Sequence, residues 1–143
     1  MSQPKLKLSV ITQEKELLSL EVDTVTVPGA QGELTILPNH IPLLTKLQTG
    51  ELRYTVGTKQ EELVVGDGFL DVGPNNTVIA LVDSASLARD LSVMQAEEAR
   101  KRAEEALADK TDKRAFILAE AAMRKAMIEL KVARKRSNST SLS

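Results

Sequence analysis

Apolar and polar side chains alternate with a period of two along several short segments of the first half of the chain. The alternating apolar positions are Leu6, Leu8 and Val10; Leu20 and Val22; Val25 and Val27; and Leu52, Tyr54 and Val56. Successive side chains of a strand point to opposite faces, so this pattern predicts strands with one buried face. Short apolar runs at 63–65 and 78–82 predict further strands, and turn signals separate all these segments. Many short strands joined by turns predict a β-sandwich or a barrel.

The second half of the chain changes to helical spacing. Ser92-Val93-Met94-Gln95 is a capping box that predicts a helix start, and Ala96, Ala99, Ala103 and Ala106 then recur every three or four residues. The pattern stops at Asp109-Lys110-Thr111-Asp112, where Thr111 or Asp112 can cap a second helix. The apolar stripe of that helix is Phe116, Ala119, Met123, Met127 and Leu130. Two amphipathic helices joined by a short loop predict an antiparallel hairpin.

The facing stripe of the first helix is mostly alanine, which permits close approach but buries little apolar area. Such a seam favours a hairpin that can detach from the β domain and open. A stably docked hairpin is equally consistent with the composition.

Glycine, proline and charge divide the chain at nearly the same place. All seven Gly and all five Pro lie at or before Pro74, and both residue types are excluded from helix interiors. Residues 1–85 carry 6 Lys and Arg against 11 Asp and Glu, whereas residues 86–143 carry 13 against 9. We therefore predict an acidic β-sandwich over 1–85, a basic helical hairpin over 86–136 and a disordered polar tail over 137–143.

Composition excludes several classes of site. With no Cys there is no disulfide, thiolate zinc site or cysteine nucleophile, and 2% aromatic residues cannot build a stacking surface for nucleic acid. The glycines of 28–32 and 66–68 lack the Lys-Ser/Thr and the following helix of a phosphate loop, so we interpret them as β-turns that need positive φ. No metal-ligand spacing is present, and we expect neither cofactor nor metal.

His40 is the single histidine of the sequence and stands between Pro38 and Pro42. General acid-base chemistry would need partners that converge on it, and the nearest acid in the sequence is Glu33. No nucleophile motif is present, so a contact residue in a surface loop is the better interpretation of His40.

The end of the second helix is strongly basic, with Arg124, Lys125, Lys131, Arg134, Lys135 and Arg136. Basic residues near a helix C-terminus complement the helix dipole. Six of them exceed what capping needs, so an acidic protein partner is also plausible.

The run GELTILPNHIPLL from Gly32 to Leu44 resembles the signature region of the epsilon subunit of the bacterial F-type rotary ATP synthase. VGDGF at 65–69 and NTVIALVDSA at 76–85 are similar to its next two blocks, in order and at the expected spacing. The resemblance covers about Leu6 to Arg136. Thr35 departs from the Gly that many members have, and on a strand either residue serves.

The resemblance implies a non-catalytic rotor subunit of a proton-translocating ATP synthase. Its sandwich would bind the gamma subunit of the central stalk and rest on the membrane c-ring, with Glu33 and His40 at family positions in loops that face the ring. Its hairpin would extend along the stalk, where the six basic residues meet the catalytic alpha and beta subunits and impede ATP hydrolysis.

Some members of this family bind ATP through an Asp-x-x-Arg-Ala pattern in the first helix and arginines in the second. Here the corresponding positions are Ser92, Gln95, Leu118 and Lys125, which depart from that motif. Without the guanidinium fork, bidentate phosphate recognition is lost, so we expect weak or absent ATP binding.

Two other classes of function remain open: a free-standing interaction module whose hairpin dimerises as a coiled coil, and a small hydrolase that uses His40 with an acid. The drifting, alanine-rich stripe argues against a strict heptad seam.

The N-terminal residues lack the apolar core of a secretory signal, and no apolar run approaches the roughly 20 residues of a spanning helix. Together with the resemblance to the ATP synthase subunit, these features lead us to expect a peripheral protein on the cytoplasmic face of the bacterial plasma membrane.

Overall fold

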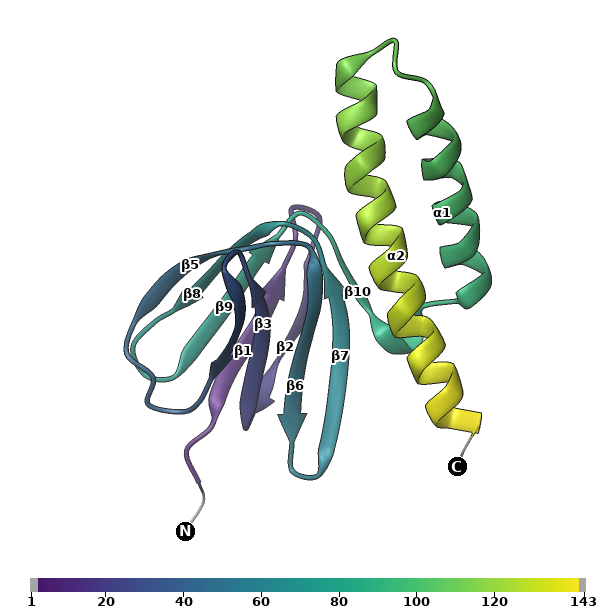
Figure 1. Cartoon of the computed structure of the whole chain (residues 1–143). Helices are drawn as coiled ribbons and strands as arrows, with labels where there is room; N and C mark the ends of the chain where they lie inside the picture. The colour runs from purple at the N-terminus through teal and green to yellow at the C-terminus, as the bar shows by residue number, and fades with distance from the viewer. Residues whose placement is uncertain (1–2, 142–143) are drawn as a thin grey trace. The chain divides into compact units, whose positions relative to one another are not determined.

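A computed structural model describes residues 3–141 of the chain, with side chains described up to residue 138. The chain divides into two compact units, the first ending at Ser86 and the second beginning at Leu87. This division lies one residue from the boundary expected from the sequence. Strands β1 to β9 belong to the first unit and the helices to the second, and the short strand β10 (Ala85–Leu87) crosses the division (Figure 1).

The first unit contains short strands that wrap into a sandwich (Figure 1). Their hydrogen-bonded order is β10-β7-β6-β3-β5-β8-β9-β1-β2, with β4 paired to β3. β3 and β5 are joined through the single pair Gly29–Leu47. The strand bounds are β1 Leu6–Ile11, β2 Glu16–Val22, β3 Thr24–Gly29, β4 Gly32–Ile36, β5 Leu43–Leu47, β6 Gly50–Val56, β7 Lys59–Val65, β8 Gly68–Val72, β9 Thr77–Val82 and β10 Ala85–Leu87.

The period-two pattern places its apolar residues in the core. Leu6, Leu8 and Val10 of β1 are fully buried, as are Leu52 of β6 and Val78 of β9. The intervening residues of these strands are more exposed. The prediction of a β-sandwich followed by a two-helix hairpin is confirmed.

The glycines of the two expected positive-φ turns have different roles. Among the described glycines, Gly32 and Gly57 have positive φ, whereas Gly29, Gly66 and Gly68 do not. The prediction of positive φ at 66–68 is therefore wrong. Gly68 begins β8, and a Cβ there would lie 2.0 Å from the carbonyl oxygen of Leu81 on β9. Close approach of two strands, not turn geometry, explains the glycine at this position.

The second unit contains a short 3₁₀ helix, η1 (Ala88–Asp90), and the helices α1 (Val93–Ala108) and α2 (Lys113–Ser141). The Ser92 hydroxyl accepts a hydrogen bond from the Gln95 amide at 3.3 Å, which caps α1. Asp112 accepts hydrogen bonds from the amides of Arg114 and Ala115, so Asp112 rather than Thr111 caps α2. Both capping residues follow the rule that a short polar side chain satisfies orphan amides.

The structure differs from the sequence-based expectation at the end of α2. Residues 137–141, expected as part of a disordered tail, continue the helix to Ser141, and residues 142–143 lie outside the described residues. The polar composition of this segment suggested disorder, but it contains no Gly or Pro that would end a helix.

The seam between α1 and α2 is built from small side chains, as expected. Ala96 and Ala103 of α1 are buried, together with Ala119, Ala126 and Leu130 of α2. The predicted stripe is correct at Ala119 and Leu130 but wrong at Met127, which is 54% exposed. Ala119, Ala126 and Ala133 are seven residues apart and Leu130 follows Ala126 by four, so at 3.6 residues per turn they lie near one face of α2. Val132 is also buried and lies off this spacing.

Candidate functional site

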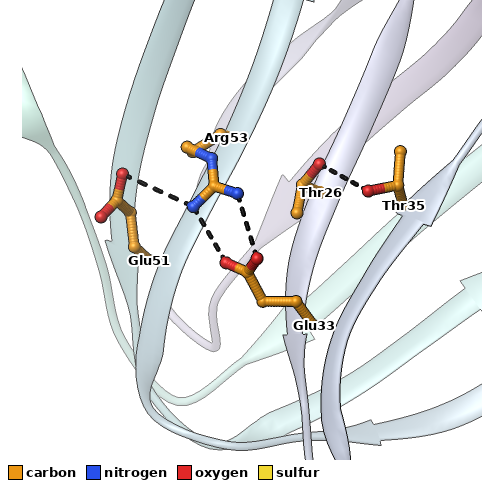
Figure 2. A network of polar contacts seen from close by, with 5 residues as sticks. All are labelled: Thr26, Glu33, Thr35, Glu51 and Arg53. Carbon is orange, nitrogen blue, oxygen red and sulfur yellow. Dashed lines mark hydrogen bonds and ion pairs between the residues drawn. The ribbon is translucent and has the colours of Figure 1, made fainter.

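Glu33 is held by an arginine from another strand. Arg53 of β6 donates from Nη1 to Oε2 of Glu33 at 2.9 Å and from Nη2 to Oε1 at 3.2 Å, a bidentate pair drawn in Figure 2. Glu51, on the same strand as Arg53, approaches the guanidinium at 4.0 Å. Beside this pair, the hydroxyls of Thr26 on β3 and Thr35 on β4 are hydrogen bonded at 3.0 Å.

The sheet register explains this gathering of polar groups. Thr26 pairs with Thr35 across β3 and β4 and with Arg53 across β3 and β6, and Arg53 pairs with Glu62 across β6 and β7. Residues that pair across neighbouring strands point to one face of a sheet, so a single polar row crosses this layer.

The ion pair sets the electrostatics of this face. The hydrogen bonds from Arg53, and then its positive charge, lower the pKa of Glu33 below its ordinary value. Glu33 in turn raises the pKa of Arg53 through the same hydrogen bonds. Glu33 is therefore an anion that has a fixed cationic partner within its own domain.

His40 lies in the loop that follows β4. Its amide donates to the Leu37 carbonyl at 3.2 Å, and its ring Nδ1 lies 2.6 Å from the Ile41 carbonyl. The preceding residue, Asn39, has φ of 69° and donates its amide to the side chain of Asn76 at 2.6 Å. These contacts tie the 37–42 loop to the turn before β9 and leave Ile41 76% exposed.

The structure does not bring Glu33 and His40 together. Glu33 lies in β4, opposite Pro28 and beside the β3–β4 turn, whereas His40 follows the other end of the same strand. The expectation that Glu33 occupies a loop is wrong, because the strand begins one residue earlier, at Gly32. An acid-base pair between His40 and its nearest acid in the sequence is not formed.

An exposed apolar face of the sandwich was missed by the sequence reasoning. Leu44 of β5, Phe69 of β8 and Leu81 of β9 are 72%, 53% and 50% exposed. Phe69 pairs directly with Leu81, and Leu81 pairs with Ile11 of β1. Across β5 and β8, Phe69 pairs with Lys46 and Leu44 pairs with Asp71, so two charged residues border these apolar side chains. We call Leu44, Phe69 and Leu81 the outer apolar face. A signal was present in the sequence: the run of apolar residues at 78–82 has no polar position for an outer, solvated face.

The basic residues of α2 are mostly exposed. Arg124, Lys131, Arg134, Lys135 and Arg136 are exposed, and Lys125 is half-buried. Arg134 donates a hydrogen bond to Glu97 of α1, so this predicted contact residue is paired across the hairpin.

The positions of the family's ATP motif are dispersed in this hairpin. Ser92 is the cap of α1 and Gln95 is exposed in its first turn. Leu118 is exposed in the second turn of α2, next to the connecting loop and therefore near the opposite end of the antiparallel hairpin. In the described part of the chain, no group of three or more His, Cys, Asp and Glu side chains could hold a metal ion.

Both halves of the chain match models of known protein domains. The beta-sandwich domain of the ATP synthase delta/epsilon chain matches residues 5–88, and the long alpha-helix domain of the same chain matches residues 89–134. Within the described residues, none of the helices has the length and apolar character that crossing a membrane requires.

Similar proteins are found among curated sequences and solved structures. The chain is 48% identical to the ATP synthase epsilon chain of Dehalococcoides mccartyi strain CBDB1, over 92% of this chain and 94% of the relative. It is 43% identical to that of Syntrophobacter fumaroxidans, over 92% and 97%.

Two solved structures share the fold. One chain of the Euglena gracilis mitochondrial ATP synthase matches with a TM-score of 0.74 at 20% identity, over 94% of this chain and 82% of that one. A chain of the Tetrahymena thermophila mitochondrial ATP synthase matches with a TM-score of 0.58 at 16% identity, over 93% and 99%.

Proposed function

Because the chain belongs to the delta/epsilon chain family of ATP synthase, we propose that it is a non-catalytic rotor subunit of a proton-translocating enzyme. The sandwich binds the gamma subunit and rests on the c-ring, and the hairpin contacts the catalytic alpha and beta subunits and slows ATP hydrolysis. The site of action is the cytoplasmic face of the bacterial plasma membrane. The similar folds come from an assembly with F1 and c-ring and from a central stalk with c-ring.

The observation that carries this proposal is the outer apolar face of the sandwich. Three large apolar side chains on adjacent strands remain half or more exposed. Scattered exposed leucines are ordinary, but large exposed apolar side chains grouped on adjacent strands are typical of a protein interface. We assign this face to the gamma subunit because a permanent partner in a rotor would keep it covered.

The polar groups support the assignment of the other contacts. His40 and the exposed Ile41 lie in a loop anchored by Asn39 and Asn76, which gives a rigid contact for the c-ring. The proposal of Glu33 as a second contact rests on the family resemblance, because Glu33 lies at the other end of β4 and is paired with Arg53. Neither residue has the convergent partners that catalysis needs, which agrees with a subunit that transmits torque by packing.

Replacement of one outer residue tests the proposal. Phe69→Asp places a charge in the proposed interface, so we expect binding to a gamma-containing catalytic complex to weaken by at least about tenfold. Leu37→Asp is the matched control, because Leu37 is 54% exposed against 53% for Phe69 and follows β4, outside the outer apolar face and outside the hairpin. Binding by surface plasmon resonance should be retained in the control. Equal binding by the Phe69→Asp and native chains would refute the assignment of this face.

The free-standing module with a dimerising hairpin is not favoured. The buried positions of α2 include Ala119, Ala126 and Ala133, which are already covered in the single chain. A coiled-coil dimer would need a second apolar seam on the hairpin. Sedimentation at increasing protein concentration would detect such a dimer.

A further inference from the structure

The hairpin has an ion pair at its open end. Glu97 lies in the second turn of α1 and Arg134 lies near the end of α2, and the Arg134 guanidinium donates to the Glu97 carboxylate. The connecting loop, 109–112, joins the helices at the other end. An opening motion that pivots on this loop must separate Glu97 from Arg134, because both residues lie far from the loop along their helices.

The pair lies in a groove between the helices. The groove, of about 560 Å³, is lined by Glu97, Arg100, Met127, Leu130, Lys131 and Arg134. Arg100 is engaged by Glu104, one turn further along α1, at 3.0 Å. Glu97 is therefore the acidic side chain of the groove lining, which also contains the three cationic residues Arg100, Lys131 and Arg134.

The remaining seam between the helices is weak enough for this pair to matter. Alanines such as Ala96, Ala103 and Ala126 bury far less area than leucines would, and the apolar contribution scales with buried area. The Arg134 and Glu97 side chains are 57% and 36% exposed, so solvent screens their attraction. A screened pair of this kind changes an equilibrium by a factor of a few rather than by orders of magnitude.

We propose that Glu97 is an internal competitor for Arg134. In the closed hairpin the Glu97 carboxylate binds the Arg134 guanidinium, which would otherwise bind an acidic segment of the catalytic subunits. The same ion pair keeps α1 and α2 together at the end of the hairpin opposite the connecting loop. This inference rests on the proposed function, in which the basic end of α2 acts on those subunits. Loss of Glu97 releases Arg134 and shifts the hairpin toward the inhibitory form.

A double-mutant cycle in the full-length chain tests the contact itself. The variants are Glu97→Gln, Arg134→Gln and both together, and the measurement is amide hydrogen exchange of α1, which reports opening even when the open form is rare. We expect Glu97→Gln to speed exchange about two- to five-fold in the native chain and to have little effect when Arg134 is already replaced. Sandwich amides serve as the reference within the same molecule.

Glu98→Gln is the matched control. Glu98 is the next residue of α1 and is exposed, so its replacement removes the same charge from nearly the same distance to the helix N-terminus. Equal effects of the Glu97 and Glu98 variants, or additive effects in the cycle, would overturn the proposal.

Inhibition of a gamma-containing catalytic complex tests the competition. We expect Glu97→Gln to inhibit ATP hydrolysis at about two- to five-fold lower concentration than the native chain, and Glu98→Gln to match the native chain. If the double-mutant cycle shows coupling between Glu97 and Arg134 but Glu97→Gln inhibits ATP hydrolysis no better than the native chain, the proposed competition is overturned. Failure of the native chain itself to bind or inhibit counts against the proposed function, while the exchange cycle still decides whether the contact exists.

Discussion

At the residue scale, the carboxylates of this protein differ in which groups donate hydrogen bonds to them. Arg53 meets Glu33 through two parallel hydrogen bonds, a geometry available to a guanidinium but not to an ammonium group. Asp23 instead accepts a 2.6 Å hydrogen bond from the Gly57 amide, and this bond lowers the pKa of Asp23. In both cases hydrogen bonds to the charged form stabilise the carboxylate.

Arg53→Gln is expected to raise the pKa of Glu33 toward its ordinary value, since the hydrogen bonds and charge of Arg53 are what lower it. NMR titration of the Glu33 carboxyl carbon measures the change. Arg53→Lys should restore the pKa only in part, because a lysine replaces the charge but not the fork. An unchanged Glu33 pKa in Arg53→Gln would show that the pair does not persist in solution.

The same substitution has a consequence for stability against pH. A carboxyl whose pKa is lowered by folding contributes stability that is present above its unfolded pKa and is lost as pH falls through the folded pKa. The native chain should therefore lose more stability than Arg53→Gln on acidification below the ordinary Glu range. Urea unfolding at several pH values measures the difference, and parallel stability curves would contradict the prediction.

At the element scale, the helices are defined by their caps more than by strong apolar seams. Asp112 satisfies the amides of Arg114 and Ala115 at the start of α2. In the loop before it, Asp109 accepts hydrogen bonds from the hydroxyl and the amide of Thr111, which lowers the pKa of Asp109. This loop therefore fixes the point from which the second helix departs.

Asp112→Ala removes the cap of α2 and should destabilise the helical unit by about 1 kcal/mol. Hydrogen exchange of the first turns of α2 should rise while exchange in the sandwich stays unchanged, because the cap belongs to the second unit. Lys110→Ala, in the same loop, is the control and should behave like the native chain. Destabilisation spread equally over both units would contradict the local account.

Local patterns predicted most elements because the cause of each lies within a few residues. Alternation at Leu6, Leu8 and Val10 fixes which face of β1 is buried, and Ser92 is followed by a helix with the expected cap. The outer apolar face and the Glu33–Arg53 pair were not predicted, because both depend on which strands become neighbours. Gly68 was misinterpreted for the same reason, since the contact that excludes a side chain comes from Leu81 on β9.

At the scale of the whole molecule, the acidic and basic halves of the sequence correspond to two structural units, for which we expect different roles. The first unit has a packed core, a polar row around Arg53 and an outer apolar face suited to a permanent partner. The second has a seam rich in alanine, a capped loop and the Glu97–Arg134 ion pair, and we expect these features to favour a change of conformation. We expect one unit to anchor the subunit and the other to regulate it.

The most direct test measures ATP hydrolysis and binding in a gamma-containing catalytic complex, with the full-length chain and with a chain ending at Ser86. The account predicts that both chains bind, because the sandwich is the anchor, and that the full-length chain lowers the hydrolysis rate while the shortened one does not. As a control, circular dichroism of the shortened chain should show that its strands are retained. A folded shortened chain that fails to bind, or a full-length chain that neither binds nor inhibits, would contradict the account.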